Sequence, residues 1–320
     1  LYLEQAGRHA EALALRTELV AMDSGLRKPA LLALAATQDD MGLFAEAARS
    51  YLAFSLEYPE EPQAAEAALR AGVLFEAQGL LADALPAYQQ ALRLEHPERA
   101  ALLLQVAALQ ADEEAMATLR RALEEGVIEA WEPLWRLDPS LVDEALAQEE
   151  LPQDLRGEML SSRIDVEAYD ALQLSGPESS LKKQFVDKSR ALRDIEGQVA
   201  AVIETGSGEW GIASLVLLGE AYEAFGESLL QSARPALEDE ALDYYEAGLA
   251  DQDAVLRMKA EEAYELALAK SFELGKANEH TDRALDRLRV LDPLDWPEQQ
   301  EELIEAGDPP PTPESYEERL

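Results

Sequence analysis

The chain has 320 residues, 65 of them acidic and 27 basic, so its formal net charge at pH 7 is −38. Nucleic acids and anionic membrane surfaces are bound through Lys and Arg, so this charge argues against both as partners and favours basic or amphipathic protein segments. The same charge also fits a solvated surface or an adaptation to salt, and composition leaves these alternatives open. The sequence has no Cys, which excludes disulfides and thiolate metal sites.

Ala, Leu and Glu dominate the composition, whereas aromatic residues make up only 6%. This favours helices whose backbones approach closely over strands. No uninterrupted apolar run reaches the ~18–20 residues of a membrane-spanning helix, so we expect no direct membrane span. A helical pattern is already under way at Leu1, and we interpret the chain as a fragment whose targeting signals lie outside it.

Turn glycines recur in the first part of the chain, where Gly7, Gly42 and Gly79 are separated by 35 and 37 residues. Each lies between two short amphipathic segments, within residues 1–24, 28–59 and 69–97. Gly adopts the positive φ that lets one helix end and the next begin. A period close to 34 residues is typical of helical repeats.

Small and aromatic residues recur at matched offsets from these glycines. Ala47 and Ala84 each follow a turn glycine by five residues, where two helices are expected to cross closely. Tyr51 and Tyr88 come one turn later and are expected to fill the space toward the neighbouring unit. This pattern resembles the tetratricopeptide repeat. The resemblance implies an all-α, right-handed solenoid of helix pairs.

The middle of the chain departs from the repeat. Residues 100–126 keep the helical period without the marker residues, so we predict a degenerate fourth unit. From residue 127 the template is lost, and Trp131 and Pro133 lie among short predicted helices. Gly, Pro and Ser cluster in residues 172–180, which predicts a linker. We therefore expect a tetratricopeptide-like array over residues 1–126, then a degenerate helical segment and linker over residues 127–180.

Residues 181–306 are predicted to form a second helical region with one repeat of the same kind. Gly219 and Gly226 match the first helix and the turn of a unit, whereas Ala260 and Tyr264 match its second helix. The residues between them contain an insertion at about 229–257, so we predict a split repeat in which a helix is lengthened. Residues 307–320 form a Pro-rich acidic tail.

Residues 206–297 also resemble the C-terminal part of large envelope-associated tetratricopeptide proteins of deltaproteobacteria, which include components of gliding motility. The resemblance rests on GEWGIASLVLLGEAYEAFGESL, AYELALAKSFELGKANEHTDRALDRL and Trp296-Pro297. A Trp commonly stands in that group where this chain has His280. The resemblance implies a bacterial, periplasmic scaffold, with a cytoplasmic location as the alternative. It implies no catalytic residues.

The sequence offers little for catalysis. His9, His96 and His280 are far apart, and none has a second His nearby at metal-ligand spacing. Acidic pairs are too numerous for spacing to select a general acid and base. There is no GxSxG elbow, P-loop or dinucleotide fingerprint. We therefore predict no catalytic, cofactor-binding or metal-binding residue.

The concave face of a solenoid is its usual surface for binding extended segments. The template places the first-helix residues on this face, namely Leu32, Ala36, Asp39, Leu69, Val73, Glu76, Val216, Glu220 and Glu223. Of these we predict partner-binding roles for Asp39, Leu69, Val73, Glu76, Glu220 and Glu223. Acids and aliphatics replace the Lys, Arg and Asn of carboxylate-clamp domains, which favours basic or amphipathic partners.

The sequence is compatible with three functions. The first is a non-enzymatic scaffold that binds protein segments within a bacterial envelope or motility assembly. The second is a structural subunit of such an assembly that uses helix edges and the 229–257 insertion for contacts. The third, favoured least, is an enzyme carried on a helical-repeat scaffold.

Overall fold

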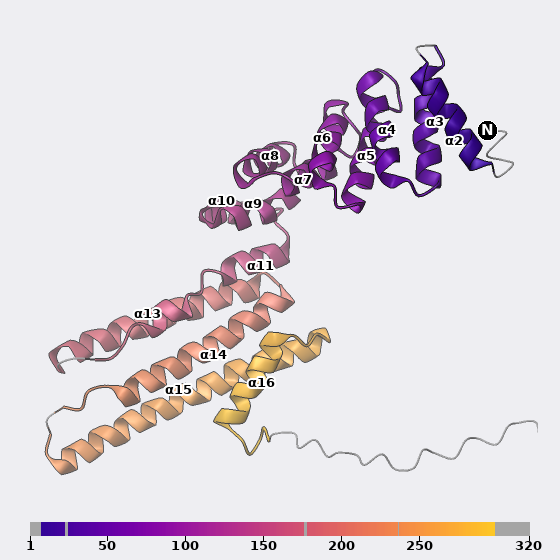
Figure 1. The fold of residues 1–320 in the computed structure, drawn as a ribbon. Coiled ribbons are helices and arrows are strands. Elements are labelled where there is room, and N and C mark those ends of the chain that lie inside the picture. The colour runs from indigo at the N-terminus through magenta and orange to yellow at the C-terminus, as the bar shows by residue number, and fades with distance from the viewer. Residues whose placement is uncertain (1–7, 23–24, 176–177, 236, 298–320) are drawn as a thin grey trace, which may run out of the picture. The chain divides into compact units, whose positions relative to one another are not determined.

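The computed structural model describes residues 8–22, 25–175, 178–235 and 237–297, and over these residues it is helical and has no strand (Figure 1). The prediction of an all-α chain is therefore confirmed. Most helices pack against their neighbours in sequence. The chain forms two compact units, Leu1–Leu151 and Pro152–Leu320, and this division falls within the segment expected to be degenerate. The predictions for Gly7 and for the tail at 307–320 lie outside the described residues.

The first unit consists of helices joined by short turns. It contains α2 (His9–Ala21), α3 (Arg27–Asp40), α4 (Phe44–Glu57), α5 (Ala64–Ala77), α6 (Leu81–Arg93), α7 (Arg99–Ala108), α8 (Asp112–Glu124), α9 (Trp131–Leu137) and α10 (Val142–Leu146), with one-turn 3₁₀ helices at Ile128–Ala130 and Pro139–Leu141. We call α3, α5 and α7 the first helices and α4, α6 and α8 the second helices of their hairpins.

The turns within the hairpins form as the sequence predicts. Gly42 and Gly79 have φ of 75° and 70°, and Gly126 after α8 has φ of 83°. The amide of Leu43 donates to the carbonyl of Gln38, and that of Leu80 to Phe75, so each turn uses carbonyls that the helix leaves unpaired. The left-handed glycine thus lets the second helix return along the first.

Small residues set the distance between paired helices. Ala47 and Ala84 are fully buried at the crossings, as predicted. In the first unit a close approach occurs at Gly72 in α5, where an added Cβ would stand 2.5 Å from the ring of Tyr88 in α6. Gly72 therefore gives the Tyr88 ring a place directly against the backbone of the partner helix.

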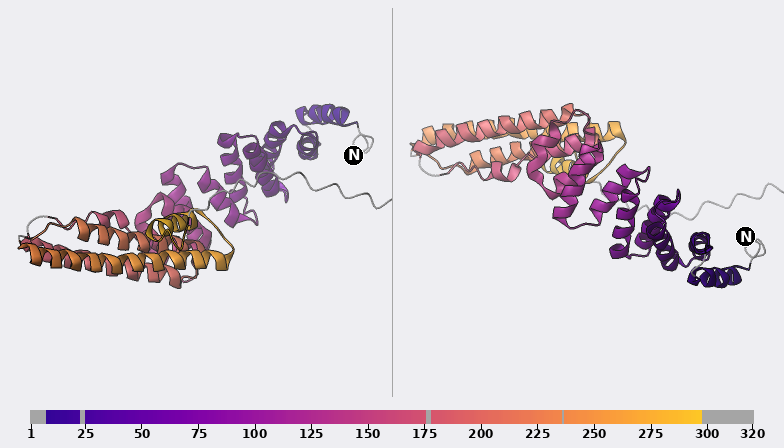
Figure 2. Two further views of the ribbon diagram at one scale, coloured as in Figure 1. Left: turned by 90° about the horizontal axis from the view of Figure 1, so that it is seen from below. Right: turned by 90° about the horizontal axis from the view of Figure 1, so that it is seen from above.

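The second unit is centred on α14 (Gly208–Gln231). Around it lie α11 (Gln153–Ser161), α12 (Val166–Asp170), α13 (Glu178–Glu204), α15 (Asp239–Leu274) and α16 (Glu279–Leu291). In Figures 1 and 2, α13, α14 and α15 run alongside one another. One apolar core joins these helices and includes Val199, Ile212, Phe225 and Tyr264.

The structure corrects the predicted turn at Gly226. Residues 208–231 are one continuous helix, and Gly226 lies inside it. An added Cβ there would stand 2.2 Å from a carboxylate oxygen of Asp253 in α15, so this glycine marks a close helix contact. Where we predicted an insertion at 229–257, α14 continues to Gln231 and α15 begins at Asp239, so both helices of the α14–α15 hairpin extend into this segment.

A buried lysine holds the short helix α12 in the second unit. The Lys188 side chain in α13 is fully buried, and its Nζ donates to the carbonyl of Leu172 at 3.0 Å. It also lies 4.6 Å from the centre of the Tyr169 ring. Burial lowers the pKa of Lys188. The ammonium group is thus placed against carbonyls at the end of α12, where a positive charge is favoured.

We predict that Gly219→Ala destabilises the second unit by about 1–3 kcal/mol, the usual cost of overpacking a core. An added Cβ at Gly219 would lie 2.5 Å from ring atoms of Tyr264, which is fully buried and has no room to move. The measurement is the free energy of unfolding from urea denaturation.

The matched control is Gly248→Ala, on an exposed face of α15 where an added Cβ meets nothing within 4 Å. It should stabilise the helix by about 0.5–1 kcal/mol, because Ala loses less backbone entropy than Gly. Equal effects of the two substitutions would contradict the close contact at Gly219.

Candidate partner-binding grooves

Five of the six predicted binding residues lie in two separate hollows, one in each unit, and the sixth, Asp39, lines neither. Leu69, Val73 and Glu76 line a hollow of about 450 Å³ in the first unit. Glu220 and Glu223 line one of about 350 Å³ in the second unit. Val216 was expected on the same open face, but it is fully buried in the core of the second unit, so that assignment is wrong.

In the first unit, the predicted acids connect successive first helices. Asp39 in α3 accepts hydrogen bonds from Arg70 in α5, with Nε at 2.8 Å and Nη2 at 3.0 Å. Glu76 in α5 accepts two from the Gln105 amide in α7, at 2.6 and 2.7 Å. Each acid therefore links its hairpin to the next one.

Glu76 also accepts a hydrogen bond from the hydroxyl of Tyr88 at 2.6 Å. Burial, and then the neighbouring carboxylate, raise the pKa of this tyrosine. Gly72, Glu76 and Tyr88 form one constellation, in which the glycine admits the ring and the acid, one turn later, binds its hydroxyl. We call this arrangement the Gly–Glu–Tyr clasp.

The second unit contains the same clasp in Gly219, Glu223 and Tyr264. The Tyr264 hydroxyl donates to Glu223 at 2.6 Å, and the ring lies against Gly219. Arg287 in α16 occupies the place that Gln105 has in the first unit, and its Nε donates to Glu223 at 3.0 Å. The clasp thus recurs at two distant places in the chain, each time joined to the helix that follows.

Ion pairing hides the predicted acids of the second unit. Glu220 pairs with Arg283, and the side chains of Glu220 and Glu223 are only 18% and 12% exposed. Burial raises the pKa of the Glu220 carboxyl despite its ion pair. The pKa of Arg287 is raised, chiefly by its hydrogen bond to Glu223. These carboxylates serve mainly to join helices, a role that the sequence prediction did not assign to them.

The hollow beside them contains further carboxylates. Glu167 and Asp170 in α12 and Glu227 in α14 line it with the paired acids, and Arg287 is the basic residue of the lining. The field in this hollow is therefore negative even though Glu220 and Glu223 are paired.

A second hollow of the first unit, of about 650 Å³, repeats the geometry of the first. Leu104 and Ala108 in α7 lie 35 residues after Leu69 and Val73. The opposite side of this hollow corresponds residue by residue to that of the smaller one. Its lining residues Glu129, Glu132, Pro133 and Arg136 lie 31 residues after Glu98, Ala101, Leu102 and Gln105, respectively.

Helix α9 therefore occupies the place of a further first helix, although sequence analysis judged the template lost at residue 127. Two Trp residues and Pro133 obscured this position, and the signal that could have revealed it is the 31-residue offset from α7. Arg136, which corresponds to Gln105, forms an ion pair with Glu132 in its own helix. We call the two hollows together the tandem groove.

The tandem groove has an apolar floor and an acidic rim. Its floor includes Leu69, Val73, Leu102, Leu104, Ala108, Leu119 and Leu137. Val73 is 41% exposed, a large fraction for Val in a folded chain. The rim contains Glu98, Asp112 and Glu129, three exposed residues to which sequence analysis assigned no binding role.

No protein-family model matches the chain, and a search of curated proteins finds none similar to it. Among the described residues, no group of three or more His, Asp or Glu side chains is arranged to hold a metal ion. In the same part of the chain, no helix is both long and apolar enough to cross a membrane.

We predict that Tyr264→Phe lowers the free energy of unfolding of the second unit at pH 7 by about 1–2 kcal/mol, because a hydrogen bond to a carboxylate is lost. Burial, and then Glu223, raise the pKa of Tyr264 in the folded chain. A tyrosine in the unfolded chain titrates near pH 10. The stabilisation is therefore complete below about pH 10 and is lost as the pH rises above it.

The check is urea unfolding of both proteins at several pH values from 7 to 11. The difference between them should shrink above pH 10, because Phe does not titrate. Tyr244→Phe serves as the control at pH 7, where we expect no change, since Tyr244 is 85% exposed. A constant difference across the whole pH range would contradict the role of the Tyr264 hydroxyl.

Proposed function

We propose that the chain is a non-enzymatic scaffold that binds basic or amphipathic segments of partner proteins in the tandem groove. The observation that carries this proposal is the repetition of one hollow at two successive junctions, with an apolar floor and carboxylates on the rim. Apolar side chains of a bound segment would fill the hollows and so be removed from water. Basic side chains would lie beside Glu98, Asp112 and Glu129.

We also propose that the helix pairs belong to a right-handed tetratricopeptide-like solenoid. Support comes from the positive-φ glycines in the hairpin turns, the fully buried alanines at the crossings, and the clasp that recurs in both units. Repeat solenoids use their inner face to bind extended segments. Of the residues predicted on that face in the first unit, Leu69, Val73 and Glu76 line the tandem groove, whereas Leu32, Ala36 and Asp39 do not.

The proposed setting is a bacterial envelope or motility assembly in the periplasm, and it rests on the resemblance of residues 206–297 alone. A test of this setting is whether the full gene product, fused to a reporter active only after export, becomes active in bacterial cells. A reporter that stays inactive while a known exported fusion works would overturn the periplasmic assignment.

The binding proposal predicts that Glu98→Lys together with Glu129→Lys weakens the binding of a basic peptide about fivefold or more at low salt. Suitable probes are eight-residue peptides with the same apolar residues and with Lys, Gln or Glu at the remaining positions. Titration calorimetry should rank their affinities as basic above neutral above acidic. The affinity of the basic peptide should also fall as salt is added.

The matched control is Glu60→Lys with Glu124→Lys, which changes the net charge equally at exposed positions outside the groove. We expect it to change the affinity of the basic peptide little. A further pair, Leu69→Ser with Val73→Ser, removes part of the apolar floor and should weaken all three peptides. If the two charge-changing pairs had equal effects, binding would depend on net charge alone and the groove assignment would fail.

A further inference from the structure

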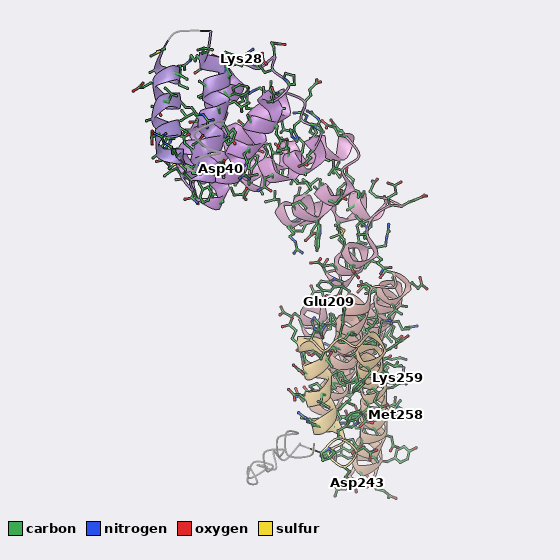
Figure 3. The ribbon with its side chains drawn as sticks, turned by 90° about the vertical axis from the view of Figure 1, so that its right-hand side faces the viewer. Lys28, Asp40, Glu209, Asp243, Met258 and Lys259 are labelled. Atoms are coloured by element: carbon green, nitrogen blue, oxygen red, sulfur yellow. The ribbon has the colours of Figure 1, made fainter. Side chains whose placement is uncertain are left out.

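An exposed apolar stripe runs along α15 in the second unit. It consists of Tyr244, Val255, Met258 and Leu266, whose exposed fractions are 85%, 47%, 61% and 52%. Figure 3 labels Met258 on this helix, with Asp243 nearer the hairpin connection. We call these four residues the α15 stripe. Single exposed apolar residues are common, but four aligned on one helix require an explanation.

The residues of the stripe align because of their spacing. Tyr244, Val255 and Leu266 are each eleven residues apart, which is close to three helical turns, and Met258 lies three residues after Val255. The buried face of α15 contains Asp253, Ala260, Tyr264 and Ala267, and it lies on the opposite side of the helix, against α14. The stripe therefore points away from the core of the second unit.

The contacts of α15 with the neighbouring helices α13 and α16 leave the stripe uncovered. On one side, Lys259 reaches Glu196 in α13 at 3.7 Å and lies 5.0 Å from the centre of the Tyr222 ring. The contact with α16 lies on the buried face of α15 opposite the stripe, where the hydroxyls of Ser271 in α15 and Thr281 in α16 are 3.0 Å apart. Within the described part of this unit, the stripe itself stays exposed to solvent.

The charges around the stripe are acidic. Asp251 and Glu262 lie in line with the stripe, each four residues before one of its apolar members, and Glu265 and Glu273 are exposed on the same side of α15. Lys259, which follows Met258 directly, forms an ion pair with Glu196. Next to Glu262, burial and the nearby carboxylates of Asp292, Glu265 and Asp295 raise the pKa of Glu261. A second copy of this chain, or an anionic membrane, would bring like charges to this surface.

We propose that the α15 stripe is a docking surface for a basic amphipathic helix of a partner protein. From Tyr244 to Leu266 the stripe is about 33 Å long at the usual helical rise, so a partner helix of about 20 residues covers it. Apolar residues of that helix at intervals of three and four would pack on the stripe, and Lys or Arg beside them would pair with the acids within and beside it. This surface lies in the second unit and does not depend on the tandem groove.

The proposal is tested with a reporter placed beside the stripe. The chain has no Cys, so Gln252→Cys gives a single site for an environment-sensitive dye, at an exposed position next to the stripe. The probe is a 22-residue helical peptide with Leu at positions 1, 4, 8, 11, 15, 18 and 22 and Lys or Ala elsewhere. We expect saturable blue-shifted emission whose affinity falls with salt, and no response to the same peptide with Glu in place of Lys.

The deciding variant is Val255→Ser, Met258→Ser and Leu266→Ser in the labelled chain. We expect it to weaken the peptide about tenfold or more, because three contact side chains lose apolar area. The matched control is Leu15→Ser, Leu56→Ser and Leu81→Ser, three leucines of the first unit that are also about half exposed. The control should leave the affinity at the Gln252 dye unchanged, and circular dichroism should show unchanged helicity in both variants.

Two results would overturn the proposal. Equal affinity of the stripe variant and its control would mean that the peptide binds there through charge alone. A dimer of the unlabelled chain in sedimentation equilibrium, abolished by the stripe variant, would mean that a second copy occupies the surface. The groove variant, Glu98→Lys with Glu129→Lys, leaves the stripe intact. Loss of peptide binding at the groove can therefore be distinguished from loss of peptide binding at the stripe.

Discussion

Both units depend on close contact between paired helices that carry very small residues at the crossing. Where Gly72 or Gly219 leaves room, a tyrosine ring of the partner helix lies directly on the backbone, and a glutamate one turn later binds its hydroxyl. In this arrangement the aromatic ring makes much of its apolar contact with the partner helix, and neither helix has to move far to admit it. The alanines buried around these crossings allow the same short distance elsewhere.

The acidic character of the chain therefore has two structural parts. Some carboxylates, such as Asp39, Glu76 and Glu223, are bound to Arg, Gln or Tyr of adjacent helices and act as links along the chain. Others, such as Glu98 and Glu262, are exposed beside apolar surface. The net charge is only the sum of these two groups of carboxylates. The bound carboxylates affect stability and the exposed ones affect recognition, each through different neighbours.

Much of the local structure could be predicted from the sequence, because it depends on residues close together in the chain. Turn glycines such as Gly42 and Gly79, and small residues such as Ala84, mark hairpins by their spacing. Gly226 misled the prediction because a glycine that ends a helix and one that admits a neighbouring side chain look alike in sequence. Only the partner, Asp253 in α15, distinguishes them.

The candidate sites were harder to predict for a related reason. Leu69, Val73 and Glu76 were correctly placed together because they share one helix face. The pairing of Glu223 with Arg287, 64 residues later, depends on how α16 returns across α14. No local pattern specifies that return.

The long α14–α15 hairpin has a further consequence for how such a chain can vary. Its two helices run past Gly226 as a pair, and the connection between them leads from the end of α14 at Gln231 to the start of α15 at Asp239. Adding one turn to both helices would move that connection by about 5.4 Å along the axis and leave the clasp at Gly219 in register. Matched insertions in both helices can therefore lengthen the hairpin by whole turns, while the packing at its base stays unchanged.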